Sequence, residues 1–136
     1  MSTRSNIGIL RRTGKVEIIY CHNDGYLSYN GKILLKNYKD INTINEMLEL
    51  GDMSYLGKTL EESFFYGKDR GEENTKKIIY DNLEEYFKKV DNLFIEYIYI
   101  FSEDKEKWYY IGTIPDIKNK IDNMEELTEE AIRNEE

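Results

Sequence analysis

The strongest constraint on the fold comes from two apolar segments near the C-terminal end, residues 94–102 (FIEYIYIFS) and 107–113 (KWYYIGT). A short charged turn joins them, so the pattern predicts an antiparallel hairpin. Alternate residues of a strand point to opposite faces, and both faces of the first segment are largely apolar. One face carries Ile95, Tyr97, Tyr99 and Phe101, and the other carries Phe94, Glu96, Ile98 and Ile100. Such a strand belongs in the centre of a sheet that helices cover on at least one side.

The N-terminal end predicts a second hairpin. Residues 5–12 and 15–21 alternate as two strands, and Gly14 between them supplies the positive φ that a tight turn requires. A short strand is expected over residues 76–80. With the helices described next, the element order is ββααβαββ. We therefore expect an α+β fold, an antiparallel sheet of about five strands with helices mainly on one face.

Short polar side chains mark where the helices are expected to begin, because their oxygens accept hydrogen bonds from the free amides of a first helical turn. These residues are Asn30, Asp40 or Asn42, and Asp81. Gly51 is expected to end the second helix, since glycine adopts the conformation of a C-terminal cap at low cost. A last amphipathic helix is expected over residues 124–134 (MEELTEEAIRN).

The length of 136 residues indicates one main domain. Residues 1–121 are expected to form a single α+β domain whose sheet closes at Pro115, and residues 122–136 an acidic C-terminal helical tail. Residues 52–75 show weak periodicity. We expect them to form an irregular connection that the aromatic residues 64–66 attach to the core. Long connections of this kind are often functional.

The charge of the chain is concentrated at its end. The formal net charge is −8; residues 122–136 hold seven acids and one base, so they carry −6 and the preceding residues carry −2. An acidic protein repels nucleic-acid phosphates, so direct nucleic-acid binding is not expected. The acidic tail either keeps the protein in solution or docks on a basic partner.

The sequence also indicates a compartment. No apolar run approaches the roughly 20 residues that span a bilayer, and the N-terminus lacks the apolar core of a signal peptide. The lone cysteine, Cys21, cannot form an internal disulfide. We therefore expect a cytoplasmic protein that makes no membrane contact.

Residues 20–31 (YCHNDGYLSYNG) hold the only histidine and the only cysteine in one polar turn. A cysteine nucleophile needs an imidazole close to its sulfur, but adjacent residues of a strand point to opposite faces. A metal site on His22 and Asp24 would lack further ligands with recognisable spacing. We therefore expect no catalytic residue, no metal and no cofactor. Cys21 should be buried beside the sheet, with His22 held by Asp24 or by a backbone carbonyl.

Other residues are candidates for binding a ligand or a partner. The 12 tyrosines either fill the core or form an exposed aromatic interface. In residues 67–73 (GKDRGEE), two cations near flexible backbone either bind an anion or pair with neighbouring acids. Arg4 is a further anion contact, or else an ion-pair partner of Asp24 or Asp69. The full set of candidates is Arg4, His22, Asp24, Tyr26, Tyr29, Lys68 and Arg70.

Five segments together resemble a family of small proteins that are common in bacteriophages and prophages. They are MSTRSNIGI (1–9), YCHNDGYLSYNGKILLKNY (20–38), LGDMSYLG (50–57), YGKDRGEE (66–73) and EYIYIFSEDKEKWYYIG (96–112). The resemblance runs through the first 112 residues and implies a phage origin, with no established catalytic residues. Small acidic phage proteins are often inhibitors of host defence, among them inhibitors of CRISPR nucleases and proteins that sequester signalling nucleotides.

These features favour a phage-encoded, non-enzymatic binding protein that inhibits a bacterial defence system. The expected partner is a CRISPR effector nuclease, whose nucleic-acid channel the acidic side chains would occupy while tyrosines anchor the contact. A second hypothesis is a nucleotide- or anion-binding module, in which the cations and tyrosines of the candidate set line one pocket. A third is a small hydrolase that uses His22 as a general base oriented by Asp24.

Overall fold

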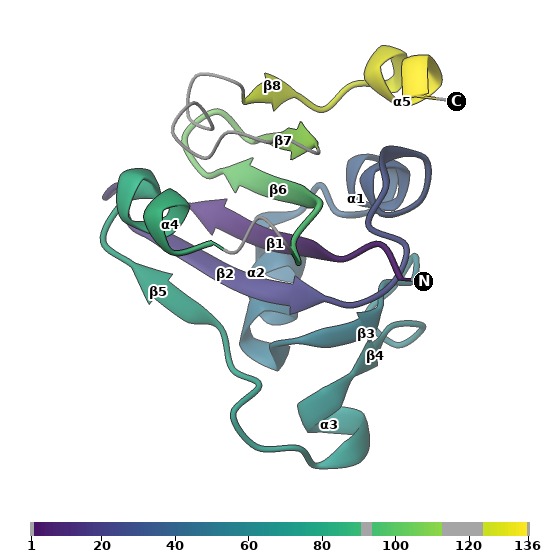
Figure 1. The fold of residues 1–136 in the computed structure, drawn as a ribbon, viewed down its shortest axis with the longest axis vertical. Helices are drawn as coiled ribbons and strands as arrows, with labels where there is room; N and C mark the ends of the chain where they lie inside the picture. The colour runs from purple at the N-terminus through teal and green to yellow at the C-terminus, as the bar shows by residue number, and fades with distance from the viewer. Residues whose placement is uncertain (1, 91–93, 113–123, 136) are drawn as a thin grey trace.

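The computed structural model describes residues 2–90, 94–112 and 124–135. Within these residues, eight strands form one sheet, accompanied by a π-helical turn and five α-helices (Figure 1). The strands are β1 (Ser5–Leu10), β2 (Val16–Cys21), β3 (Met53–Tyr55), β4 (Phe64–Phe65), β5 (Ile78–Tyr80), β6 (Tyr97–Ser102), β7 (Lys107–Gly112) and β8 (Glu125–Glu126). The helices are η1 (Leu27–Gly31), α1 (Lys32–Asn37), α2 (Ile41–Leu50), α3 (Tyr66–Arg70), α4 (Leu83–Lys89) and α5 (Glu129–Glu135).

The sheet is mixed. Its strands lie in the order β4-β3-β2-β1-β6-β7-β8, and β5 pairs with β2 beside that path. The two expected hairpins, β1–β2 and β6–β7, are antiparallel. However, β1 runs parallel to β6 from the Ser5–Tyr97 pair to the Leu10–Ser102 pair, and β2 runs parallel to β3. The α+β class is therefore confirmed, but the expected antiparallel sheet of about five strands was wrong. Neither hairpin encodes in its local sequence how the two hairpins pair with each other.

Helices cover both faces of the sheet, and Figure 1 shows α4 in front of it with α2 behind. The face toward α1, α2 and α5 carries Ile7, Ile9, Ile19, Tyr99 and Phe101. The face toward α4 carries Val16, Ile18, Ile98, Ile100 and Ile111. The two-sided apolar pattern expected for residues 94–102 is therefore confirmed within β6, because each of its faces lies in a different buried cluster.

Gly8 in β1 leaves space that the α4 side of the sheet requires. A Cβ at this position would lie 2.4 Å from the Glu17 carbonyl oxygen and 2.4 Å from the Ile18 Cδ1 atom. Ile18 thus packs over the glycine in a central strand, where any larger residue would push β2 away from β1.

Residues 52–75 contain three short regular elements, so the expectation that the whole connection is irregular was wrong, whereas Phe65 is buried in the core as expected. β3 pairs antiparallel with β4 through Met53 and Phe65, and both side chains are buried. α3 follows β4 without a break. Strands of two and three residues are too short to show a clear alternation, which is why the sequence did not reveal them.

The observed helix ends agree in part with those expected from the sequence. Asp40 caps α2 through its side chain, and Gly51 ends that helix with a φ of 87°, both as expected. α4 is capped by Asn82 rather than by Asp81; the Asn82 side chain accepts a hydrogen bond from the Glu85 amide. In both helices the capping oxygen replaces a missing intrahelical partner.

The C-terminal segment packs on the sheet. β8 pairs with β7 and α5 follows, so residues 124–134 are only partly helical. Leu127 and Ile132 are buried in the cluster that also contains residues of α1 and α2. Pro115 and the expected domain boundary at residue 121 lie outside the described residues.

A charge network joins the β1–β2 hairpin to α2. Glu17 accepts hydrogen bonds of 2.7 Å from both Arg11 and Lys77, and Arg11 also reaches Glu103 at 3.4 Å. Lys77 pairs with Glu49 of α2 as well. The hydrogen bond from Arg11 and the one from Lys77 lower the pKa of Glu17 to about 2 against the effect of burial. The two cations therefore hold this largely buried carboxylate in its ionised form.

We expect stability to fall at acid pH because Glu17 must then be protonated. Its pKa is lower in the folded chain than in the unfolded chain, where it is near 4.5. Its contribution is therefore complete above about pH 5 and is lost as the pH falls toward about 2. Glu17→Gln should lower the free energy of unfolding at neutral pH by roughly 1–3 kcal/mol and flatten its pH dependence over this range.

Urea unfolding across this pH range measures both effects. Glu49→Gln is the matched control, because the Glu49 side chain is mostly exposed, and it should change stability far less. The same pH dependence in Glu17→Gln as in the wild type would contradict the role given to Glu17.

Candidate functional site

The turn after β2 is fixed against the sheet by close contacts. Asp24 adopts a φ of 58°, so the left-handed residue of the turn is an aspartate. Gly25 is needed for space: a Cβ there would lie 2.8 Å from the Ser5 Cβ and 2.9 Å from the Thr3 carbonyl oxygen. The Tyr99 hydroxyl donates a hydrogen bond of 2.6 Å to the Gly25 carbonyl. The turn is thereby tied to both β1 and β6.

Asn30 lies inside this turn and is not the helix cap that the sequence suggested. It is fully buried, and its Nδ2 donates to the Asn23 carbonyl at 3.2 Å and to Ser5 Oγ at 3.3 Å. α1 follows Gly31 and has no side-chain cap. The amide of Asn30 thus holds the two arms of the turn together.

Cys21 and His22 do not form a nucleophile and its base. Cys21 is buried, and its Sγ donates to the Asn23 carbonyl at 3.6 Å. Burial raises the pKa of the Cys21 thiol to about 12, so almost no thiolate exists near neutral pH. The Nδ1 atom of His22 lies 2.7 Å from the Tyr20 hydroxyl. Tyr20 therefore holds this imidazole, and the expectation that Asp24 or a carbonyl does so was wrong.

Asp24 is paired with Tyr26 instead. The Tyr26 hydroxyl donates to the Asp24 carboxylate at 3.3 Å, and the negative charge of Asp24 raises the pKa of Tyr26. The ring centres of Tyr26 and Tyr29 lie 6.2 Å apart in an edge-to-face arrangement. Tyr29 is 38% exposed. The outer side of the turn therefore presents aromatic rings to solvent.

Arg4 lies just before β1 and contacts aromatic side chains. Its guanidinium carbon is 5.8 Å from the centre of the Phe94 ring. Burial raises the pKa of Tyr20, and Arg4 is near enough to that phenol to offset part of the rise. No ion pair among the described residues joins Arg4 to Asp24 or Asp69. The structural ion pair considered for Arg4 is thus not formed.

Arg70 is held over two aromatic rings at the end of α3. Its Nε donates a hydrogen bond of 2.7 Å to the Glu72 carboxylate. Its guanidinium carbon lies 5.0 Å from the centre of the Tyr66 ring and 5.9 Å from that of Phe64. A guanidinium in this position is attracted by the negative face of a ring. Arg70 is thus both paired with an acid and stacked on aromatic rings.

The other charged residues of α3 have different surroundings. Asp69 accepts a hydrogen bond of 2.8 Å from the Phe65 amide and so braces the junction between β4 and α3. Lys68 is exposed. The pairing of residues 67–73 with one another, one of the two expectations for this segment, therefore holds for Arg70 with Glu72.

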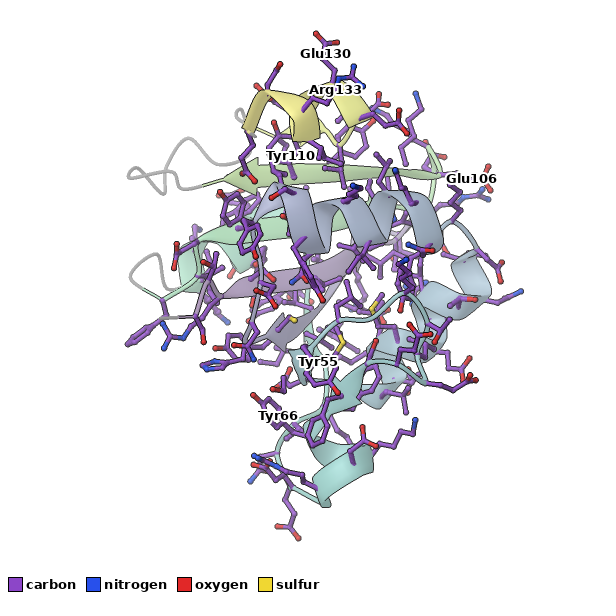
Figure 2. All side chains as sticks on the ribbon, turned by 90° about the vertical axis from the view of Figure 1, so that its right-hand side faces the viewer. Tyr55, Tyr66, Glu106, Tyr110, Glu130 and Arg133 are labelled. Carbon is purple, nitrogen blue, oxygen red and sulfur yellow. The ribbon has the colours of Figure 1, made fainter. Side chains whose placement is uncertain are left out.

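Tyr55, Phe64, Tyr66 and Arg70 form what we call the aromatic row. The ring centres of Tyr55 and Phe64 lie 5.9 Å apart, and those of Phe64 and Tyr66 lie 6.4 Å apart. Tyr55 is 43% exposed. Figure 2 shows Tyr55 and Tyr66 near each other on the face turned to the viewer. The row lies at the β3–β4 end of the sheet.

A groove of about 590 Å³ lies between the start of α1 and the segment that follows β3, and we call it the tyrosine groove. It begins where the aromatic row ends, since Tyr55 belongs to both. Two aromatic rings, two cations and one acid lie among its lining residues. They are Tyr29, Lys32, Tyr55, Lys58 and Glu62.

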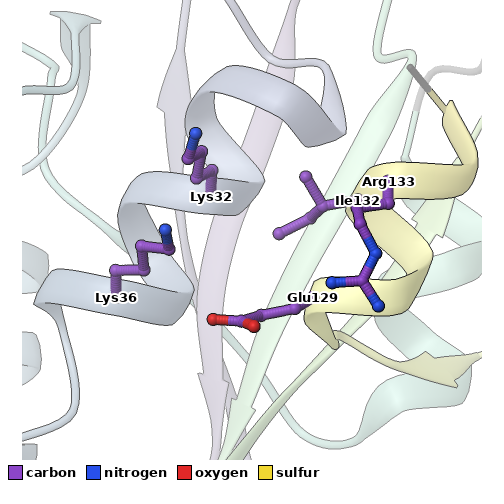
Figure 3. Close-up of a pocket in the computed structure, with 5 residues that line it drawn as sticks. All are labelled: Lys32, Lys36, Glu129, Ile132 and Arg133. Atoms are coloured by element: carbon purple, nitrogen blue, oxygen red, sulfur yellow. The ribbon is translucent and has the colours of Figure 1, made fainter.

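A smaller hollow of about 140 Å³ lies between α1 and α5 (Figure 3). Lys32 lines both this hollow and the tyrosine groove, so α1 forms a ridge between them. Lys36, Glu129 and Arg133 line the hollow as well, and Figure 3 shows the two lysines on α1 opposite the side chains of α5. Cations therefore gather around α1 in a chain whose net charge is −8.

The seven candidate residues do not converge on one pocket. They divide among the start of β1 with the end of β2 (Arg4, His22), the turn (Asp24, Tyr26), the tyrosine groove (Tyr29) and α3 (Lys68, Arg70). The single pocket expected for a nucleotide- or anion-binding module is thus not built from this set.

Sequence reasoning missed Tyr55, Lys32 and Lys58. Tyr55 fell within residues 52–75, where no strand was expected, so its exposed position on β3 could not be foreseen. Lys32 and Lys36 are spaced by four residues on a helix, which was a usable sign of a basic helix face. Lys58 comes near α1 through tertiary structure alone.

Within the described ranges, no three His, Cys, Asp or Glu side chains lie close enough together to hold a metal ion. No helix in these ranges is long and apolar enough to cross a bilayer.

In comparisons with known proteins, no family model, no curated protein and no solved structure matches the chain. The resemblance to small phage proteins therefore stays a prediction.

We expect Cys21 to be unreactive in the folded protein, because its thiol is buried and its pKa is high. At about pH 8, Ellman's reagent should label the folded chain far more slowly than the chain unfolded in urea. The rate in buffer should rise with destabilising substitutions elsewhere, since reaction requires opening of the turn. Rapid, stoichiometric labelling of the folded chain would contradict this and restore Cys21 as a candidate nucleophile.

Proposed function

We propose that the protein is a non-enzymatic binding protein that inhibits a bacterial defence protein, with a CRISPR effector nuclease as the expected partner. In this proposal it is encoded by a phage and acts in the cytoplasm of the infected bacterium. The observation that carries the binding role is the aromatic row, with its partly exposed rings and its stacked arginine.

The composition of the aromatic row matches that of protein interfaces. Tyrosine, phenylalanine and arginine are enriched where two proteins meet, and tyrosine and arginine are frequent among the residues that contribute most to affinity. Glu72 and the rings of Phe64 and Tyr66 already restrict the Arg70 side chain. Less conformational entropy is then lost on binding, which favours this surface as a contact site.

Acidic side chains lie close to the aromatic row in the sequence. Four exposed carboxylates lie in the same part of the chain: Glu61, Glu62, Glu72 and Glu73. They would complement a basic surface, such as the channel in which a nuclease binds nucleic acid. We infer a defence protein as the partner from the resemblance to phage proteins. We infer from the aromatic row which surface contacts that partner.

The hydrolase alternative has less support. A general base needs a free ring nitrogen and a group that orients the ring. In His22 the Nδ1 atom contacts the Tyr20 hydroxyl, while the Asp24 carboxylate accepts from Tyr26. This alternative needs a hydrogen bond between His22 and Asp24. The hydrogen bonds that these two described residues form do not include one between them.

Binding to purified CRISPR effector nucleases, with and without their guide RNA, tests the proposal. We expect a complex at low salt that weakens as salt rises, because the acids around the aromatic row contribute long-range attraction. Tyr66→Ala should weaken this complex by roughly 2 kcal/mol, about thirtyfold, if Tyr66 anchors the contact.

Tyr109→Ala is the matched control. Tyr109 is also half-buried and also has a cation near its ring, Lys105 at 5.6 Å, but it lies on β7, far from β4 in the strand order. Its replacement should leave binding unchanged. If no effector nuclease is retained at low salt, or if both variants bind like the wild type, the proposed function is wrong.

A further inference from the structure

The tyrosine groove has the dimensions and the lining of a small-molecule site. Its volume of about 590 Å³ lies within the range of roughly 300–1,000 Å³ that is usual for ligand pockets. Tyr29 of η1 and Tyr55 of β3 line it, and these residues are 38% and 43% exposed. Exposed aromatic rings that meet in a concave surface offer flat apolar faces on which a planar ligand can stack.

The charge of the tyrosine groove is opposite to that of the whole chain. Lys32 and Lys58 line it together with one carboxylate, Glu62. Neither lysine takes part in an ion pair among the described residues. Lys36 and Arg133 extend the basic surface into the adjoining hollow (Figure 3). In a chain with a net charge of −8, unpaired cations at one concave surface indicate an anionic ligand.

We propose that the tyrosine groove binds a nucleotide, whose base stacks on the ring of Tyr29 or Tyr55 and whose phosphate is bound by Lys32 and Lys58. One ligand that carries both a planar aromatic group and an anion can contact the rings and the ammonium groups together, because both line the same groove. Lysine binds phosphate as a flexible point charge, so no fixed bidentate geometry is required. This inference does not depend on the proposed inhibition of a defence protein.

The cations of the hollow between α1 and α5 favour nucleotides with more than one phosphate. Lys32 lies at the junction of the two concave surfaces, and Lys36 and Arg133 lie beyond it. A second or third phosphate adds negative charge near this group of cations, and the added charge strengthens the electrostatic attraction. We therefore expect nucleoside diphosphates and triphosphates to bind more tightly than monophosphates.

Isothermal titration calorimetry of the full chain tests the proposal with AMP, GMP, CMP and UMP, their diphosphates and triphosphates, the four nucleosides and inorganic phosphate. At least one nucleotide should bind, and its affinity should exceed that of its nucleoside and that of inorganic phosphate by about tenfold or more. Lys58→Gln and Tyr29→Ala should each weaken that nucleotide about tenfold. The matched controls are Lys76→Gln, which removes an exposed lysine elsewhere, and Tyr109→Ala; both should bind like the wild type.

Circular dichroism checks that the two groove variants are folded. Because Tyr29 and Lys58 lie at the surface, both variants should show the spectrum of the wild type. Absence of binding by every nucleotide at millimolar concentration would overturn the proposal. Equal affinity for a nucleotide and its nucleoside would do so too, since the lysines would then contribute nothing. Unchanged affinity in both groove variants would place any observed binding outside the groove and also overturn it.

Discussion

The parallel pairing of β1 with β6 is the interaction on which the rest of this structure depends. It joins two hairpins from opposite ends of the chain, from the Ser5–Tyr97 pair to the Leu10–Ser102 pair. Through this pairing Ile7 and Ile9 continue the apolar face of Tyr99 and Phe101, so that one buried cluster spans both hairpins. The chain between β2 and β6 must close as a long loop before this pairing forms, which costs entropy that the shared core then offsets.

The turn at residues 20–31 is held in place by that central pairing. The Tyr99 hydroxyl of β6 donates to the Gly25 carbonyl, and Gly25 lies against Ser5 of β1. Once the turn is fixed, η1 and α1 start from a defined position, and Tyr29 and Lys32 meet Tyr55 and Lys58 across the tyrosine groove. The candidate binding surfaces thus lie on short elements that a rigid sheet positions. This arrangement is common, since binding residues often lie on segments outside the main core.

Local sequence was informative where a feature depends on neighbouring residues. The two apolar faces of β6, the turn at Gly14 and the cap at Asp40 are all decided within a few residues, and the structure has each of them. The parallel strands could not be predicted, because a pairing between segments about 90 residues apart leaves no local pattern. The candidate site was predicted least well for the same reason. Tyr29 was identified from its turn, whereas Lys58 and Tyr55 become site residues only because they line the same groove as the start of α1.

Native-state hydrogen exchange followed by NMR tests whether a rigid pair of hairpins carries a less stable binding edge. We expect amides of β1 and β6 to exchange only through global unfolding, with the largest free energy of opening in the chain. Amides of β4 and α3 should exchange through local opening at a clearly lower free energy, because these elements are short and lie at the edge of the sheet. If amides of β1 and β6 exchange as readily as those of β4 and α3, the two hairpins are not the most stable part of the fold.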